Sequence, residues 1–249
     1  MNLLPELMVK VFSYLRAVTS PSLYLKGEVG DGREKALLEY VLQHAAECNP
    51  ESVLQAIDKY AQRTWLMNVG AEKGQILDTT ILNRKPRVVL ELGAYCGYSA
   101  IRIASQLQDP ESTLISLEMN PQNAAIARTM IDFAGLSSKV QVIEGILSTR
   151  MEELRTILQE MNARYFDVVF IDHDKGAYLS DMLLLKESSL IGQGTVLVAD
   201  NMGIPGSPAY SKYLKSHPLE LETVEHKCGL EYLSWLPDIV TVSTYLACE

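Results

Sequence analysis

The sequence contains little cysteine and lacks two common motifs for binding phosphate groups. Its 4 cysteines among 249 residues show no C-x-x-C spacing, so neither a zinc site nor a disulfide framework is indicated. This usage is typical of a reducing compartment, and we expect a cytoplasmic protein. The main glycine turn has neither the G-x-G-x-x-G spacing of a dinucleotide site nor a Gly-Lys-Ser/Thr ending, which excludes both of those phosphate cradles.

Basic residues are also scarce. Lys and Arg number 22 against 31 Asp and Glu, which gives a formal net charge of -9 and an isoelectric point near 5.0. Nucleic acids and anionic membranes attract clustered positive charge, so we expect neither as a partner. A small-molecule substrate is favoured instead.

The start of the chain has the spacing of an amphipathic helix but not of a membrane span. Residues 1–16 are too short and too charged to cross a bilayer. Such a helix can dock on a membrane surface or on a partner protein, but its two basic residues attract lipid only weakly. We favour packing on the protein's own body or on a second subunit, in a monomer or a homodimer.

The chain is long enough to bury a sizeable core, and we expect one domain. From residue 88 onward, apolar strand-like runs alternate with helical stretches, which predicts a doubly wound, mostly parallel α/β sheet with right-handed crossovers. The last two runs have no helix between them and predict an antiparallel hairpin. The predicted strands are Val88–Leu92, Leu114–Glu118, Val140–Ile143, Asp167–Ile171, Gly194–Ala199, Leu219–His226 and Ile239–Ala247.

The residues before the first strand are predicted to be mostly helical. Apolar spacing predicts helices over residues 1–16, 33–47, 51–64 and about 74–83. Residues 19–32 are rich in Ser, Pro and Gly and predict a connector, and residues 65–73 predict a loop.

The stretch VVLELGAYCGYS, residues 88–99, predicts a strand, a glycine turn and the start of a helix. Such a turn at the carboxyl end of a central strand lets a ligand approach the backbone. Glu91 can meet a cationic amine, and Glu118, at the end of the next strand, can bind paired ribose hydroxyls. A nucleoside with a cationic amino-acid tail, such as S-adenosylmethionine, fits this layout. The alternative is a structural turn with incidental glycines.

Acidic residues follow two later strands. FIDHDK brings Asp172 to the end of one strand, and VADN brings Asp200 and Asn201 to the end of the next. Because parallel strands end at the same edge of a sheet, these oxygen ligands suit a divalent cation, most naturally Mg²⁺. The alternative is that they cap the following helices. Beside a cation the ammonium form of Lys175 is disfavoured, which favours a general base over an ordinary surface lysine.

Several stretches together resemble the catechol O-methyltransferase family. WLMNVGAEKGQ, VLELGAYCGYSA, FAGL, DHDK, LLLKESSLI, GTVLVADN, IPGSP and LEY align with it in order from about Glu51 to the end of the chain. The resemblance implies a Rossmann-like, seven-stranded methyltransferase sheet with a reversed last hairpin. It also implies a catalytic core at residues 51–249 and a helical extension at residues 1–50.

The resemblance further implies a site for S-adenosylmethionine, Mg²⁺ and a catechol. Lys175 matches the general base, and Glu231 matches the carboxylate that holds the second catechol hydroxyl. Asp172, Asp200 and Asn201 match the Mg²⁺ ligands, Trp65 and Pro205 match the apolar walls over the ring, and Lys175 and Asn201 also face the substrate. The positions that match the cofactor site are Met67, Val69, Glu91, Gly93, Tyr95, Tyr98, Ser99, Glu118, Met119, Ser148, Asp172 and His173.

The chain departs from the family pattern at two places. Asp174 stands where the family usually has Trp, and Ile146, Leu147 and Ser148 replace Ala-Ser-Gln. The first change removes a flat apolar wall, and the second removes an amide expected to contact adenine. Two alternatives therefore stay open beside the catechol enzyme: a catalytically weak relative that acts as a binding or trafficking protein, and an enzyme for a larger ortho-diphenol ester.

Overall fold

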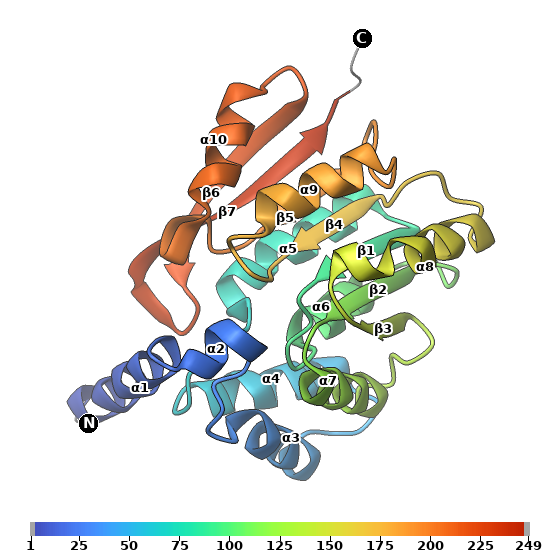
Figure 1. Cartoon of the computed structure of the whole chain (residues 1–249). Coiled ribbons are helices and arrows are strands. Elements are labelled where there is room, and N and C mark those ends of the chain that lie inside the picture. The colour runs from blue at the N-terminus through green and yellow to red at the C-terminus, as the bar shows by residue number, and fades with distance from the viewer. Residues whose placement is uncertain (1–2, 247–249) are drawn as a thin grey trace.

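The computed structural model describes residues 3–246 and contains a seven-stranded sheet in the order β3-β2-β1-β4-β5-β7-β6. Five strands are parallel, and β7 runs antiparallel to both β5 and β6. Figure 1 shows the parallel strands at the centre and the long β6–β7 hairpin at one side. The strands are β1 (Val88–Leu92), β2 (Thr113–Glu118), β3 (Val140–Glu144), β4 (Val168–Ile171), β5 (Val196–Ala199), β6 (Leu221–Leu230) and β7 (Leu233–Tyr245).

Helices cover both faces of the sheet because neighbouring side chains of a strand point to opposite sides. Val89 of β1 belongs to the core under α3 to α7, whereas Leu90 belongs to the core under α8 to α10. The helices are α1 (Leu3–Val18), α2 (Pro21–Lys26), α3 (Arg33–His44), α4 (Pro50–Ala61), α5 (Gly70–Arg84), α6 (Tyr98–Gln106), α7 (Pro121–Phe133), α8 (Leu147–Glu160), α9 (Tyr178–Glu187) and α10 (Pro208–Ser216), with a short π-type turn at Met202–Gly206.

The doubly wound sheet and its antiparallel hairpin confirm the fold predicted from the sequence. Three local predictions were wrong. The hairpin strands run closer to their shared turn than predicted, because β6 continues to Leu230 and β7 begins at Leu233. The segment 19–32 contains the short helix α2, which begins at a proline and ends at Gly27 in the left-handed conformation. The loop predicted at 65–73 ends early, because α5 begins at Gly70. Ala247, predicted as the last strand residue, and Cys248 lie outside the described residues.

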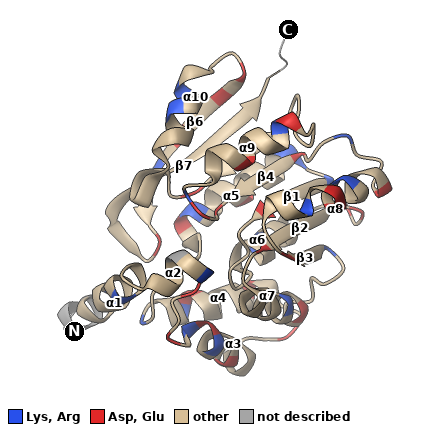
Figure 2. Cartoon of the chain, in the orientation of Figure 1, with Lys and Arg blue, Asp and Glu red and all other residues tan. Residues whose placement is uncertain are grey.

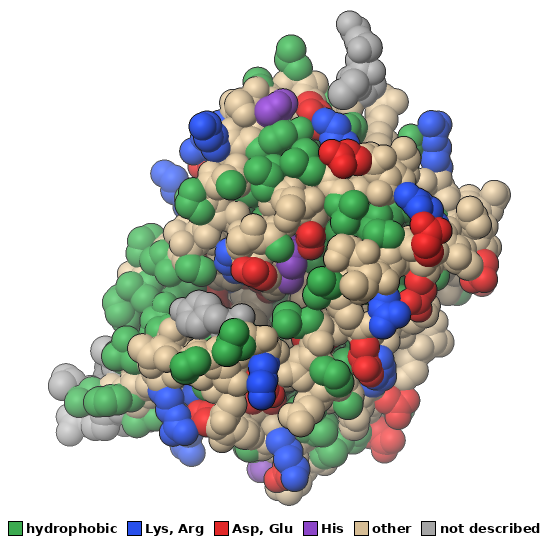
Figure 3. Space-filling model, viewed as in Figure 1, with side chains coloured by type: hydrophobic (Ala, Val, Ile, Leu, Met, Phe, Trp, Pro, Cys, Tyr) green, Lys and Arg blue, Asp and Glu red, His purple; other side chains and the backbone are tan. Residues whose placement is uncertain are grey.

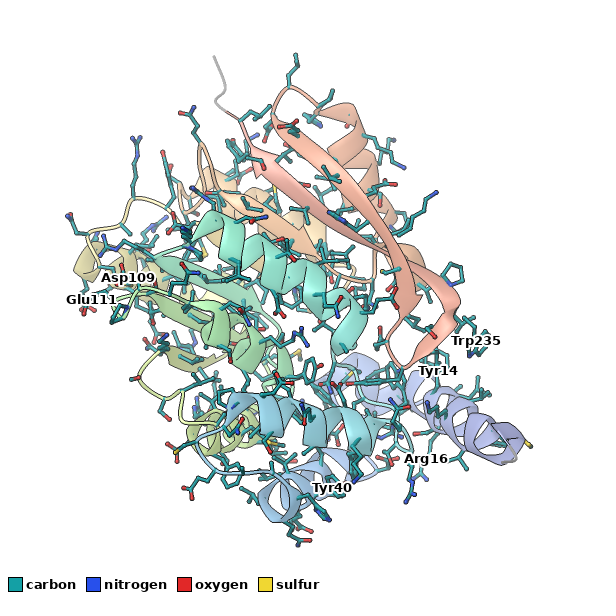
Figure 4. The ribbon with its side chains drawn as sticks, turned by 180° about the vertical axis from the view of Figure 1, so that it is seen from behind. Tyr14, Arg16, Tyr40, Asp109, Glu111 and Trp235 are labelled. Carbon is teal, nitrogen blue, oxygen red and sulfur yellow. The ribbon has the colours of Figure 1, made fainter. Side chains whose placement is uncertain are left out.

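Helix α1 lies beside the end of the β6–β7 hairpin. Its Tyr14 ring meets the Trp65 ring edge-on, with centroids 5.2 Å apart, and Ala17 is buried in the same small cluster. Figure 4 shows Tyr14 on α1 near the hairpin end, where Trp235 projects outward. The second half of α1 therefore packs on the protein's own body, although Met8 and Phe12 are exposed. The side chains of residues 1–7 lie outside those described.

The surface carries both signs of charge. Figure 2 shows Lys and Arg interspersed with Asp and Glu over the described helices, in keeping with the overall acidic composition. In the described part of the chain, residues 3–246, no helix has the length and apolar character needed to cross a membrane.

Candidate active site

The glycine turn after β1 lies against the end of β4. Gly93 has φ +99°, and a Cβ atom there would come within 2.6 Å of the Asp172 carbonyl oxygen. Gly97, at φ +89°, approaches Ala127 of α7 in the same way. Glycine is favoured at both points because L side chains rarely adopt these positive φ values, and at Gly93 the close approach also excludes a Cβ atom. The turn therefore sits where the ends of β1, β2 and β4 meet.

Glu91 is fully buried beside this turn. Ser116 donates a hydrogen bond to its Oε2 atom, whereas Oε1 is buried without a hydrogen-bond partner among the described residues. Burial raises the pKa of Glu91 to about 7, although the hydrogen bond from Ser116 favours the carboxylate. An unpartnered buried carboxylate oxygen is costly unless a ligand meets it.

Glu118, at the end of β2, binds the backbone of the turn. Its Oε2 accepts from the Tyr95 N–H at 2.7 Å, and its Oε1 accepts from the Asn120 N–H at 2.8 Å. Burial raises the pKa of Glu118 to about 7 despite these backbone hydrogen bonds. The backbone thus holds this carboxylate in a fixed position at the edge of the turn.

Other predicted cofactor positions surround this turn. His173 contacts Asp181 through Nε2 at 2.9 Å, and its Nδ1 is buried without a hydrogen-bond partner in the described region. Met119 is 48% exposed, beside the Glu118 carboxylate. Tyr95 donates to Glu34 at 2.9 Å. Val69 and Ser99 are buried, Met67 is half-buried, and Ser148 is exposed in the first turn of α8.

One predicted cofactor residue points elsewhere. The Tyr98 hydroxyl donates to Asp58 of α4 at 3.0 Å and accepts from Arg102 at 3.3 Å, so it joins helices behind the turn. Only its backbone, at the start of α6, adjoins Gly97. We therefore assign the Tyr98 side chain a role in holding the helix start.

The acidic residues after β4 and β5 form a connected group. The Lys175 Nζ lies 2.8 Å from Asp172 Oδ1 and 2.6 Å from the Tyr178 hydroxyl. That hydroxyl donates to the Asp200 carbonyl at 3.1 Å. Tyr178 thus links the two strand ends.

Asn201 connects this group to the β6–β7 hairpin. Its backbone N–H donates to Asp200 Oδ1 at 2.7 Å, and its side-chain Nδ2 donates to Glu231 Oε2 at 3.2 Å. The structure therefore brings Asp172, Lys175, Asp200, Asn201 and Glu231 together in one hydrogen-bonded group. On the face viewed in Figure 3, acidic, basic and histidine side chains lie together at a hollow between α2 and α9.

Sequence analysis missed two residues at the centre of the group, Lys73 and Asp238. The Lys73 Nζ lies 2.8 Å from Asp200 Oδ2, 2.7 Å from Glu231 Oε2 and 3.1 Å from Asp238 Oδ2. Burial disfavours the ammonium form, but the three carboxylates hold the pKa of Lys73 well above its usual range. Lys73 lies on the buried stripe of α5 with Leu77, and a lysine at such a position was the available signal. For Asp238 the sequence carries no comparable signal.

The two predicted walls, Trp65 and Pro205, come from different parts of the chain. The Trp65 Nε1 donates to the Glu231 carbonyl at 3.2 Å. Pro205 is exposed on the turn at Met202–Gly206, which Asp238 holds by accepting the N–H groups of Gly203 and Ile204.

Comparison with known proteins identifies this arrangement. A family model described as O-methyltransferase matches residues 43–217. The chain belongs to the O-methyltransferase family. The match covers β1 to α10 but not the hairpin residues Glu231 and Asp238.

Individual O-methyltransferases agree with this assignment. The chain is 43% identical to mouse (Mus musculus) catechol O-methyltransferase over 206 residues, covering 82% of this chain and 76% of that protein. It is 44% identical to the bovine (Bos taurus) enzyme, covering 82% and 74%. The fold matches an O-methyltransferase from Bacillus cereus solved with SAH, at a TM-score of 0.62 and 22% identity over 84% of this chain and 90% of the other. The resemblance noted in the sequence is confirmed, and the protein is a methyltransferase enzyme.

Proposed function

We propose that this O-methyltransferase transfers the methyl group of S-adenosylmethionine to one hydroxyl of a catechol, assisted by Mg²⁺, in the cytoplasm. One observation carries the proposal: Lys175 and Glu231 flank the oxygen ligands Asp172, Asp200 and Asn201 through a continuous chain of hydrogen bonds. The 43–44% identity to proteins named catechol O-methyltransferase supports the same substrate class.

The residues around the glycine turn fit S-adenosylmethionine. The unpartnered Glu91 Oε1 suits the cationic amine of the methionine tail. The backbone-anchored Glu118 suits the ribose hydroxyls, and the exposed Met119 offers an apolar face to the adenine. The unpartnered His173 Nδ1 provides a further polar contact.

The donor set at the strand ends fits Mg²⁺. Among the described residues, no three His, Cys, Asp or Glu side chains form a metal cluster, but Asp172, Asp200 and the Asn201 amide offer hard oxygen donors of the type that Mg²⁺ prefers. Bound there, Mg²⁺ would supply positive charge for two adjacent phenolic oxygens as one of them loses its proton.

The protein's own side chains account for the remaining steps. Lys175, as the neutral amine, accepts the proton of the reacting hydroxyl at Nζ, with Asp172 and Tyr178 fixing its position. Glu231 accepts a hydrogen bond from the second hydroxyl, while Trp65 and Pro205 flank the catechol ring. The phenolate oxygen then forms a bond to the methyl carbon as the carbon–sulfur bond breaks, and the electron pair stays on the thioether sulfur. Holding the two reactants in line supplies much of the acceleration.

We assign this chemistry to residues 51–249 and treat residues 1–50 as a helical extension over the cofactor. Asn120 and Asn123 of the α7 start donate to the carbonyls of Lys26 and Gly27 at 3.0 and 2.9 Å. These bonds hold the end of α2 beside the proposed adenine position.

A second candidate substrate is a larger ortho-diphenol ester, favoured by Asp174. This residue is exposed, and its Oδ1 accepts the Gly176 N–H at 3.0 Å, so its carboxylate turns back onto its own loop. The loop therefore provides no flat apolar wall at this position, and a bulkier substrate can be accommodated.

The test is transfer of a labelled methyl group from S-adenosylmethionine to catechol, with Mg²⁺ and with chelator. We expect turnover with Mg²⁺ only, and a fall of at least 100-fold in kcat for Lys175→Ala, in line with the size of general-base effects. Lys212→Ala, an exposed lysine of α10, serves as the matched control and should leave kcat unchanged.

Other outcomes point to the alternatives. Turnover of an ortho-diphenol ester but not of catechol would favour the second substrate class. Binding of S-adenosylmethionine without transfer to either substrate would favour a binding or trafficking protein. Full activity in chelator would reject the role of Mg²⁺.

A further inference from the structure

Asp238 is a buried carboxylate of β7 that joins three parts of the site. Its Oδ1 accepts the backbone N–H groups of Gly203 at 3.0 Å and Ile204 at 3.1 Å. Its Oδ2 lies 3.1 Å from both Lys73 Nζ and Asn201 Nδ2. Asp238 is only 2% exposed, so water does not compete for these hydrogen bonds. One carboxylate therefore contacts the lysine, the amide of a proposed cation ligand and the turn that carries Pro205.

The hydrogen-bond chemistry fixes which way the Asn201 amide faces. Ionised carboxylates only accept hydrogen bonds, so the edge of Asn201 facing Asp238 and Glu231 must be the NH₂ group. The amide oxygen then lies on the opposite edge, directed away from both carboxylates. Lys73 favours this arrangement because its Nζ donates to the same two oxygens, at 2.7 Å from Glu231 Oε2 and 3.1 Å from Asp238 Oδ2, so both oxygens act as acceptors.

The backbone adds a second constraint. Asn201 adopts the left-handed conformation, with φ 52° and ψ 40°, which asparagine tolerates better than most residues. With the backbone set and the NH₂ group held by two carboxylates, the side chain has a single satisfied orientation. The oxygen is free to act as a ligand in that orientation only.

We propose that Asp238 is a positioning residue, which orients the Asn201 amide so that its oxygen, and not its NH₂ group, is presented to the cation. The inference rests on the proposed function, because Asn201 is a ligand only if the site binds Mg²⁺. Residues that orient metal ligands in this way typically contribute about 10- to 100-fold to metal affinity.

The first test is binding of Mn²⁺, a paramagnetic probe for the Mg²⁺ site, to the full chain by electron paramagnetic resonance. Asp238→Asn keeps an oxygen for the backbone N–H groups of the turn but turns an NH₂ group toward Asn201. We expect this variant to bind Mn²⁺ about 10- to 100-fold more weakly. Glu222→Gln, an equal loss of charge at an exposed position of β6, should change the affinity less than twofold.

The second test distinguishes orientation from a merely structural role. Asn201→Asp places a third carboxylate against Asp238 and Glu231. In that background Asp238→Asn restores a donor–acceptor pair, with an NH₂ group at 238 donating to a carboxylate at 201. We therefore expect Asp238→Asn to strengthen Mn²⁺ binding in the Asn201→Asp protein, a reversal of its effect on the wild type. The Asn201→Asp protein and the double variant can be compared with each other even if the single Asp238→Asn protein does not fold.

Three results would overturn the proposal. The first is wild-type Mn²⁺ affinity in a folded Asp238→Asn protein. The second is weakened binding by Asp238→Asn in both backgrounds, which indicates general damage to the fold. The third is a wild-type protein that binds no Mn²⁺, which also rejects the magnesium part of the proposed function, whereas the first two leave that function intact.

Discussion

The Trp65 indole N–H donates to the backbone carbonyl of Glu231 across 3.2 Å. Trp65 precedes α5, and Glu231 lies at the turn between β6 and β7, so this bond joins distant parts of the chain at the wall of the proposed catechol pocket. Tyr14 of α1 packs against the same indole ring. The first helix thus supports a residue of the proposed catechol pocket.

Trp65→Phe tests this bond because it keeps an aromatic ring and removes the donor. Losing one intramolecular hydrogen bond costs about 1 kcal/mol of folding stability, and because the indole then loses its anchor we expect KM for catechol to rise while kcat stays within about twofold. Trp235→Phe is the control, since Trp235 is 60% exposed at the hairpin end. Steady-state kinetics check the prediction, and a fall in kcat at unchanged KM would contradict it.

The buried carboxylate of Glu91 predicts a pH dependence of cofactor binding. Its pKa is raised from 4.5 to about 7 in the cofactor-free protein. Below pH 7, Glu91 must therefore lose a proton before it can pair with the cationic amine of the cofactor. We expect the affinity for S-adenosylhomocysteine to rise roughly tenfold between pH 6 and pH 8. Calorimetry at pH 6 and pH 8 should show that Glu91→Gln binds S-adenosylhomocysteine more weakly and lacks this roughly tenfold change in affinity with pH.

The raised pKa of Glu91 also makes folding stability fall as the pH rises, whereas cofactor affinity increases. Because the folded pKa lies above the unfolded one, the folded state holds an extra proton between pH 4.5 and about 7. The stabilisation from that proton is complete below pH 4.5 and is lost as the pH rises through 7. Glu91→Gln should therefore gain stability relative to the wild type between pH 5 and pH 8, and an unchanged difference in urea unfolding would argue against the raised pKa.

Gly93→Ala should damage both folding and cofactor binding. A Cβ at this position would lie 2.6 Å from the Asp172 carbonyl in a left-handed backbone, so the ends of β1 and β4 must separate. The matched control is Gly32→Ala, which has φ +82° but nothing within 4 Å of the added Cβ. We expect a loss of about 1 kcal/mol for the control and about 2 kcal/mol more for Gly93→Ala in denaturant unfolding. Equal losses would contradict the close approach.

Lys73→Met should strongly destabilise the protein. Removing the ammonium group leaves Asp200, Glu231 and Asp238 buried and close together, and removing one partner of a buried ion pair typically costs about 3–5 kcal/mol. Lys212→Met, at an exposed position of α10, should be neutral. Urea unfolding measures both, and a loss below about 1 kcal/mol for Lys73→Met would show that the carboxylates do not need the lysine.

Asp174→Trp tests the missing wall of the pocket. The indole would add apolar contact beside the ring, so we expect KM for simple catechols to fall several-fold while larger ortho-diphenol esters lose efficiency. Asp174→Asn separates the effect of charge from that of size and should change KM little. Unchanged KM values for several catechols with Asp174→Trp would reject the interpretation.

The part of the site that could be predicted from sequence lies at strand ends. Glu91, Asp172 and Asp200 each follow an apolar run, and parallel strands necessarily bring such residues to one edge. Helix α2 also carries local sequence signals, a proline at its start and Gly27 at its end. These features depend on residues close together in the chain.

The central ion cluster could not be predicted in the same way. Lys73 is separated by 127 residues from Asp200 and by 165 from Asp238. Which carboxylates surround the lysine depends on how the hairpin packs against α5, and no local pattern specifies that packing. The lysine on the buried stripe of α5 indicated only that some partner exists.

The position of β7 also determines when the site can form during synthesis. This strand lies between β5 and β6, and it follows Glu231 and carries Asp238. A nascent chain that has emerged only as far as α10 therefore contains Lys73 and Asp200 but neither of the other two carboxylates. Lys73 can be buried among its carboxylates only after the β6–β7 hairpin has packed. Both strands must therefore emerge from the ribosome before the active centre can form.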